Sequence, residues 1–280
     1  MTYMRKPEWL LQKRESVDNF SVVSKAIKEH GLHTICTSGK CPNMSECWSK
    51  GTATLMIGGN ICTRSCKFCN VATGRPLPLD PMEPLHVAES IQKMQLKHAV
   101  ITSVDRDDMK DGGANHWAAT LREVKRLNPN TTLEVLIPDF DGKTDLIQIV
   151  IDEKPNIISH NLETVRRLTP QVRSKAKYDT SLKVLAYIAQ SGLVAKTGIM
   201  LGLGETEEEI LELMDDALAA GCEVITIGQY LQPSRKHLPV TEYIRPEKFA
   251  EYKKIGLEKG FRQVESGPFV RSSYHAEKHV

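Results

Sequence analysis

Short apolar runs alternate with amphipathic stretches from Thr54 onward, and this alternation is typical of βα units built on a parallel sheet. The apolar runs predict strands over Thr54–Ile57, His98–Val104, Thr131–Pro138, Asn156–His160, Ala195–Leu201 and Glu223–Leu231. The amphipathic stretches predict helices over Pro84–Gln95, Asn115–Leu127, Thr144–Asp152, Ser181–Gln190, Thr206–Ala220 and Pro246–Lys259, followed by a short strand at Phe261–Glu265.

The number of predicted strands limits the architecture. Six strands are too few for a complete eight-stranded barrel, so we predict an α/β fold of about six βα units. An open partial TIM-type barrel and a doubly wound sheet both fit this count. We expect an open barrel over 53–265, an N-terminal extension over 1–52 with a helix at Ser21–His30, and a C-terminal segment over 266–280.

Polar side chains follow every predicted strand. Both architectures bind ligands at the carboxyl ends of their strands. Polar or ligand-type groups occur there in 62–69, 103–108, 139–141, 161–163, 202–205 and 229–230. We therefore expect the reactive face of the molecule at these strand ends, including Asp105, Asp107 and Asp108.

Charge and hydropathy exclude several classes of protein. Lys and Arg number 37 against 35 Asp and Glu, and a formal net charge of +2 gives no support for nucleic-acid binding. No apolar run reaches the ~20 residues of a membrane span. Met1–Arg14 lacks the apolar core of a secretory signal. We expect a cytoplasmic protein with neither a nucleic-acid nor a membrane partner.

The cysteines are distributed unevenly. Their number, seven, excludes a fully paired disulfide framework, and a reducing compartment would keep clustered thiols free for metal. Six lie between Cys36 and Cys69, whereas Cys222 stands alone and is expected to be a small buried apolar residue. The histidines near the C-terminal end are expected to face solvent.

The first cysteine motif follows the first predicted strand, as Cys62-Thr-Arg-Ser-Cys66-Lys-Phe-Cys69. Three thiolates on one tight loop suit a cubane iron–sulfur cluster, normally held by four thiolates, and leave one iron open for a non-protein ligand. The alternative is a zinc site completed by a distant histidine.

The second motif lies upstream, as Cys36-Thr-Ser-Gly-Lys-Cys41-Pro-Asn-Met-Ser-Glu-Cys47. It again supplies three thiolates without an adjacent fourth ligand. The spacing leaves two interpretations open, a second cluster with a chemical role and a structural zinc or cluster that attaches the extension to the barrel.

The first motif, with Phe68 before its last cysteine, resembles the radical S-adenosylmethionine superfamily. This resemblance implies that S-adenosylmethionine chelates the open iron, and that one electron from the cluster cleaves it to a 5′-deoxyadenosyl radical. That radical abstracts hydrogen from strong C–H bonds. In such chemistry the protein binds and orients the cofactor and the substrate, and it excludes side reactions.

Both motifs together resemble the lipoyl synthase family, and the resemblance covers nearly the whole chain. It extends over Arg5–Leu10, Cys41–Trp48, Thr54–Asn70, Ser103–Asp108, Asp111–Gly113, His160–Val165, Lys196–Glu205, Thr226–Pro233 and Gly267–Ala276. The implied reaction inserts sulfur at C6 and C8 of an octanoyl chain on a lysine of a lipoyl carrier domain. It uses two S-adenosylmethionine molecules per product, and the auxiliary [4Fe–4S] cluster supplies the sulfur.

The resemblance also implies partners. They are the glycine-cleavage carrier protein and 2-oxoacid dehydrogenase acyltransferase subunits as substrates, flavodoxin or ferredoxin as reductant, and an iron–sulfur cluster donor. Two rival functions remain at this stage. One is another radical enzyme with an auxiliary cluster, such as a methylthiolating enzyme, and the other is an iron–sulfur electron carrier or a zinc-pinned interaction module.

Site residues follow from the same resemblance. Cys62, Cys66 and Cys69 would hold the radical cluster, and Cys36, Cys41 and Cys47 the auxiliary cluster. The C-terminal segment would fold back so that Ser273, preferred over Ser272, is the fourth auxiliary ligand, while Arg271 offsets charge or forms a surface salt bridge. The expected cofactor contacts are Phe68, Thr102, Ser103, Asn161, Glu163, Arg173, Glu205 and Tyr230.

Overall fold

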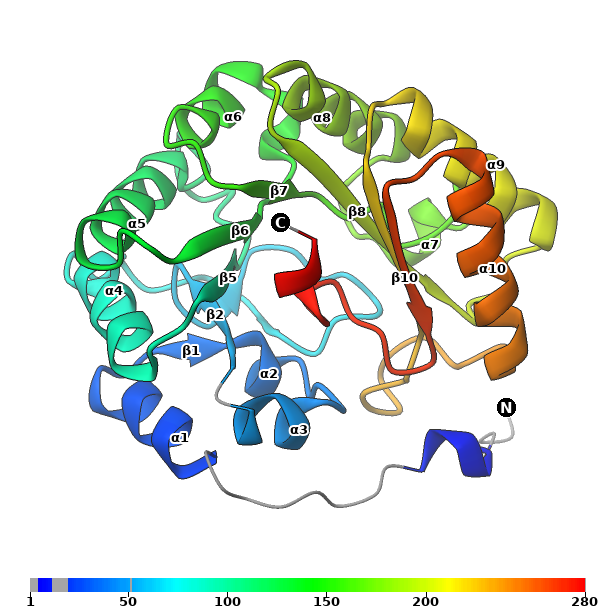
Figure 1. Ribbon diagram of the computed structural model, residues 1–280, viewed down its shortest axis with the longest axis horizontal. Helices are drawn as coiled ribbons and strands as arrows, with labels where there is room; N and C mark the ends of the chain where they lie inside the picture. The colour runs from blue at the N-terminus through cyan, green and yellow to red at the C-terminus, as the bar shows by residue number, and fades with distance from the viewer. Residues whose placement is uncertain (1–4, 12–19, 51, 280) are drawn as a thin grey trace.

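The protein forms an open barrel of mostly parallel strands surrounded by helices (Figure 1). The computed structural model describes residues 5–11, 20–50 and 52–279. One sheet has eight strands in the order β1-β2-β5-β6-β7-β8-β9-β10, in which every pair is parallel except β1 with β2. The partial TIM-type architecture, rather than a doubly wound sheet, is therefore confirmed.

The predicted strands occur at the expected places. The sheet consists of β1 (His33–Thr34), β2 (Thr54–Ile57), β5 (His98–Ser103), β6 (Thr132–Leu136), β7 (Ile157–Ser159), β8 (Val194–Leu201), β9 (Val224–Gln229) and β10 (Gln263–Gly267). Most positions in β2 and β5–β9 are buried, because helices cover one face of the sheet and the barrel interior the other.

The helices follow the predicted amphipathic stretches to within a few residues. They are α1 (Phe20–Glu29), α4 (Glu83–Met94), α5 (Ala114–Leu127), α6 (Thr144–Ile151), α8 (Tyr178–Gln190), α9 (Glu207–Ala219) and α10 (Pro246–Lys259). A capping box starts α9, in which Thr206 accepts from the Glu209 N–H and the Glu209 carboxylate accepts from the Thr206 N–H. No helix in the described part of the chain is long and apolar enough to cross a membrane.

Short elements surround the cysteines and were not predicted. They are β1, α2 (Ile35–Ser38), α3 (Met44–Ser49), and a separate two-stranded sheet of β3 (Ile61–Cys62) and β4 (Ala72–Thr73). A further short helix, α7 (Thr169–Val172), precedes α8. The single-turn helices η1 (Glu8–Leu10), η2 (Phe140–Gly142) and η3 (Ala276–Lys278) complete the fold.

The C-terminal segment occupies the barrel interior. After β10 it turns back, and its red trace with η3 lies in the middle of the ring of strands (Figure 1). Val270, Ala276 and His279 are each buried there. His279 was expected to face solvent, and this expectation is wrong because the segment enters the barrel.

Candidate cluster and cofactor site

One cavity of about 1480 Å³ lies inside the barrel, and both cysteine motifs reach it. Its lining includes all six clustered cysteines, from two separate regions of the chain, together with strand ends and the C-terminal segment. Cys222 lies elsewhere and is buried, as predicted. The cavity exceeds the size of ordinary small-molecule pockets, and so has room for more than one ligand.

The loop Cys62–Cys69 follows β2 and is fixed at the barrel mouth by backbone contacts. Cys62 Sγ accepts hydrogen bonds from the N–H groups of Arg64 and Asp105, each at 3.4 Å. Lys67 N donates to Val172 O at 2.9 Å, and His237 Nε2 lies 2.9 Å from Cys69 O. Neighbouring loops therefore hold the three thiols in place from both sides.

Arg64, inside this loop, is a buried cation that sequence reasoning missed. It forms two hydrogen bonds to Asp107 at 2.9 and 2.8 Å and one to Asp139 at 2.8 Å. Burial alone would lower the pKa of Arg64, but the hydrogen bonds that it donates to Asp107 and Asp139 raise that pKa above its usual value. Asp107 and Asp139 thus attach the cysteine loop to β5 and β6, whereas Asp108 pairs with Arg106 instead.

The second cysteine loop packs beside the first. Thr34 caps α2 by accepting from Thr37 N at 3.2 Å, and this short helix carries Cys36. Cys47 lies in α3. Asn70 Nδ2 donates to Ser38 O at 2.8 Å, which joins the two cysteine loops directly.

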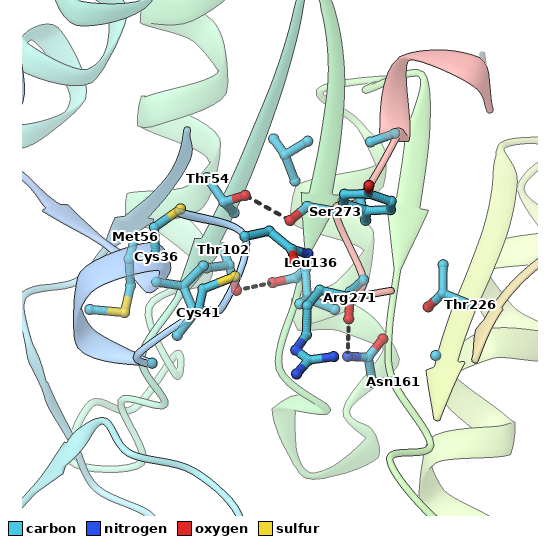
Figure 2. A pocket seen from close by; sticks show the side chains of 18 of the residues that line it. Cys36, Cys41, Thr54, Met56, Thr102, Leu136, Asn161, Thr226, Arg271 and Ser273 are labelled. Atoms are coloured by element: carbon cyan, nitrogen blue, oxygen red, sulfur yellow. Dashed lines mark hydrogen bonds between the residues drawn. The ribbon is translucent and has the colours of Figure 1, made fainter. Parts of the chain in front are cut away.

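The two serines of the C-terminal segment point in different directions. Thr54 Oγ1 donates to Ser273 Oγ at 2.7 Å, on the side of Cys36 and Cys41, as Figure 2 shows. Asn161 Nδ2 donates to Ser272 Oγ at 2.7 Å, on the other side of the segment. Both serines line the cavity, but Ser273 lies beside Thr54, whose backbone N–H bonds to Cys36.

Burial keeps most of these thiols protonated. It raises the pKa of Cys47 and of Cys62 to about 12 and that of Cys69 to about 11. It also raises the pKa of Cys36 and Cys41, against which backbone hydrogen bonds from Thr54 and Asn43 act. A metal centre would displace these protons, because thiolates rather than thiols are the ligands. Buried thiols with N–H donors aimed at sulfur are the setting in which proteins hold iron–sulfur clusters.

Comparison with known proteins identifies the family of the chain. A family model described as the Radical SAM superfamily matches residues 56–217. Lipoyl synthase from Phocaeicola vulgatus is 65% identical over 280 residues, covering 100% of this chain and 99% of the relative. Lipoyl synthase from Porphyromonas gingivalis is 66% identical over 279 residues, covering 99% of each chain. The chain belongs to the lipoyl synthase family. It is therefore a radical S-adenosylmethionine enzyme, whose superfamily implies a [4Fe–4S] cluster and S-adenosylmethionine.

A solved structure shows the same fold at low sequence identity. SuiB from Streptococcus suis, bound to the precursor peptide SuiA, superposes with a TM-score of 0.61 at 12% identity. The match covers 92% of this chain and 54% of that longer chain. The partial barrel is thus shared between this lipoyl synthase family member and SuiB, a protein solved with a bound precursor peptide.

Most expected cofactor contacts lie along the cavity. Asn161 and Glu163 follow β7, and Asn161 Nδ2 donates to Glu163 Oε1 at 3.1 Å. Burial raises the pKa of Glu163, although the positive charge of Arg173 opposes this. Arg173 is buried rather than on the surface and donates to Ser181 Oγ at 2.8 Å. The expected contacts that line the cavity are Phe68, Thr102, Ser103, Asn161, Glu163, Arg173 and Tyr230.

Glu205 is placed differently from the other expected contacts. Its Oε2 accepts from the N–H groups of Gly202, Leu203 and Gly204 at 2.9, 3.0 and 3.2 Å. The side chain is absent from the lining of the main cavity. Its visible role is therefore to stabilise the turn after β8.

A zinc site completed by a histidine was the alternative to a cluster at the cysteine loops. Among the described residues, no three His, Cys, Asp or Glu side chains lie close enough together to hold a single metal ion.

Arg271 is half-buried near Cys41 and donates to Val270 O at 2.6 Å. It forms no ion pair with a carboxylate of the described chain. The salt bridge considered for Arg271 thus has no carboxylate partner among the described residues.

Proposed function

We propose that the two cysteine loops of this lipoyl synthase family member each hold a [4Fe–4S] cluster, facing one another across the barrel cavity. The observation that carries the proposal is that six thiols from two separate motifs line a single cavity. One cavity with two three-thiol sites provides a place for a substrate chain between two clusters. Catalysis by the protein is then mainly positioning.

Cys62, Cys66 and Cys69 would hold the radical cluster. With S-adenosylmethionine bound, this centre supplies a carbon-centred radical that removes hydrogen from unactivated C–H bonds. Nearby polar groups fit the polar parts of that cofactor. Asn161 Oδ1 is buried without a hydrogen-bond partner in the described chain, and Glu163 is a buried carboxylate on the same strand end. Phe68, Thr102, Ser103, Arg173 and Tyr230 would complete the cofactor pocket.

Cys36, Cys41, Cys47 and Ser273 would hold the auxiliary cluster. The Ser273 hydroxyl lies on the side of these thiols, whereas Ser272 is bound by Asn161. A hard oxygen ligand suits iron–sulfur sites less well than a thiolate, so this attachment is weak. A weakly attached cluster suits a role as sulfur donor. Arg271 would offset negative charge near Cys41.

This placement assigns a role to each part of the chain. The extension 1–52 and the segment 266–280 would together enclose the auxiliary cluster, and 53–265 would form the radical core. The substrate would be an octanoyl chain on the lysine of a glycine-cleavage carrier protein or an acyltransferase subunit of a 2-oxoacid dehydrogenase. Two S-adenosylmethionine molecules are needed, since C6 and C8 each lose a hydrogen atom.

The proposal requires further proteins and a reducing location. A flavodoxin or ferredoxin would supply electrons, and a cluster donor would rebuild the auxiliary site. All seven cysteines are free thiols, as a cluster enzyme in the cytoplasm requires.

An anaerobic assay tests the proposal. The reconstituted chain is incubated with dithionite, S-adenosylmethionine and an octanoyl-lysyl peptide, and the peptide is analysed by mass spectrometry. The expected result is a gain of two sulfur atoms with release of 5′-deoxyadenosine. Release of 5′-deoxyadenosine without sulfur gain would contradict sulfur insertion but keep the radical chemistry. No cleavage of S-adenosylmethionine would instead favour an electron carrier.

A further inference from the structure

A buried ion pair lies inside the barrel, away from the cysteine loops. Lys196 of β8 and Glu134 of β6 are 2.6 Å apart, and each side chain is 1% exposed. Ser159 Oγ donates to the same Glu134 oxygen at 3.0 Å. Nothing in the proposed reaction uses these groups. A buried ion pair is costly to desolvate, so we expect this pair to have a positioning role and not only a stabilising one.

The C-terminal segment supplies the remaining contact of this pair. Lys196 Nζ lies 3.0 Å from His279 Nδ1, and His279 is 1% exposed. Because an ammonium group only donates, the histidine must accept through Nδ1 and carry its proton on Nε2. Burial and the charge of Lys196 lower the pKa of His279 to about 3, so the ring is neutral and able to accept.

His279 lies at the opposite end of the barrel from the strand tips. Its carbonyl accepts from Arg262 at 2.7 Å, just before β10 begins. The segment therefore leaves the end of β10, runs back through the barrel and reaches Lys196 of β8 at His279. Along its course the segment accepts hydrogen bonds at Phe269 from Asn43, at Ser272 from Asn161 and at Ser273 from Thr54. Tyr274 then donates to Glu46, and the last attachment is Lys196 to His279.

We propose that Glu134, Lys196 and His279 form an anchor that fixes the C-terminal segment in the barrel and thereby positions Ser273 at the auxiliary cysteines. Glu134 orients the lysine, and the lysine holds the imidazole. Five residues lie between Ser273 and His279, so loss of the distal attachment lets the intervening segment move. His279 and Lys196 are positioning residues, since neither touches the cysteines.

The anchor rests on the proposed role of Ser273 as a cluster ligand. The test distinguishes failure of the anchor from failure of that role. The variants are His279→Ala, His279→Asn and Lys278→Ala. Asparagine keeps an acceptor near the position of Nδ1 and should restore the anchor. Lys278 is an exposed neighbour on the same turn, so its variant is a matched control.

The first measurement uses the metal-free chain. Hydrogen–deuterium exchange over residues 268–279 should rise about tenfold in His279→Ala, as expected for loss of a hydrogen bond to a charged group. It should stay at the parent level in His279→Asn and Lys278→Ala. Exchange in the strands reports whether the fold itself is intact. Unchanged exchange of the segment in His279→Ala would overturn the anchor.

The second measurement uses the reconstituted chain with a chelator. Auxiliary iron should be lost about tenfold faster from His279→Ala. The rate of S-adenosylmethionine cleavage, which reports the other cluster, should not change. Equal iron retention despite a released segment would overturn the link between the anchor and Ser273. Loss of both clusters would indicate general destabilisation and would also overturn that link. A parent chain that binds only four irons would instead contradict the proposed function.

Discussion

At the scale of single residues, Arg64 organises the mouth of the barrel. Its side chain is 5% exposed and lies within ion-pair distance of Asp105, Asp107, Asp139 and Asp141. The arginine belongs to the loop Cys62–Cys69, whereas the aspartates follow β5 and β6. One cation therefore gathers three loops around the site, and its removal leaves the buried Asp139 carboxylate without its ion-pair partner.

Arg64→Gln is expected to lower the free energy of unfolding by about 3–5 kcal/mol, the range for breaking one partner of a buried ion pair. Urea denaturation measures the change. The control is Arg122→Gln, because Arg122 pairs with Glu153 but is 65% exposed, and exposed pairs contribute at most ~1 kcal/mol. Equal losses in the two variants would show that burial of the Arg64 cluster is energetically unimportant.

The two serines give a second prediction at this scale. Ser273→Ala removes the hydroxyl on the side of Cys36 and Cys41, so the reconstituted variant should retain less auxiliary iron than the parent. Ser272→Ala changes a hydroxyl bound by Asn161 and should retain the parent amount. Iron analysis after gel filtration measures both. The reverse pattern would move the proposed ligand to Ser272.

Single residues also show what sequence reasoning can and cannot reach. The cysteine spacing was sufficient to predict both thiol groups, because it is a local property of the chain. Arg64 was missed, since its importance depends on aspartates more than forty positions away that only the fold brings near. His279 was misplaced for the same reason, because burial of a terminal histidine depends on where the segment folds.

At the scale of elements, β9 and the C-terminal segment are in unusually close contact. A Cβ built on Gly228 would lie 2.1 Å from the carbonyl oxygen of Val270. Glycine is therefore required on β9 for the segment to enter the barrel at this point, which explains a residue that otherwise weakens a strand.

Gly228→Ala is expected to push Val270 away from β9 and to lower stability by about 1–3 kcal/mol, as overpacking does. Thermal unfolding measures the loss, and hydrogen exchange over 268–279 should rise in parallel. Gly74→Ala is the control, because its Cβ would meet Ile61 at an ordinary 3.5 Å. A Gly228→Ala protein as stable as this control would contradict the close packing.

Long periodic elements could be predicted and short ones could not. The helix over Pro246–Lys259 was predicted with the bounds it has, because its apolar positions repeat over several turns. The strand β1 and the helix α2 contain two and four residues, too few for any periodicity. They form because β2 offers an edge for pairing and Thr34 caps the turn.

At the scale of the whole molecule, the open barrel and the two cysteine loops define one enclosed space. One loop precedes β2 and the other follows it, Asn70 and Ser38 join them, and the C-terminal segment completes the lining. The sequence pattern predicted the partial barrel and its reactive face. The common cavity required the fold, because it depends on the path of the segment after β10.

The central claim is that one cluster generates the radical and the other supplies the sulfur. The most direct test loads the chain with clusters made from sulfide enriched in a heavy sulfur isotope, removes free sulfide, and allows a single turnover with an octanoyl-lysyl peptide in buffer containing ordinary sulfide. The account predicts that both inserted sulfur atoms carry the heavy isotope and that auxiliary iron is released. Insertion of ordinary sulfur, with all the iron retained, would contradict it.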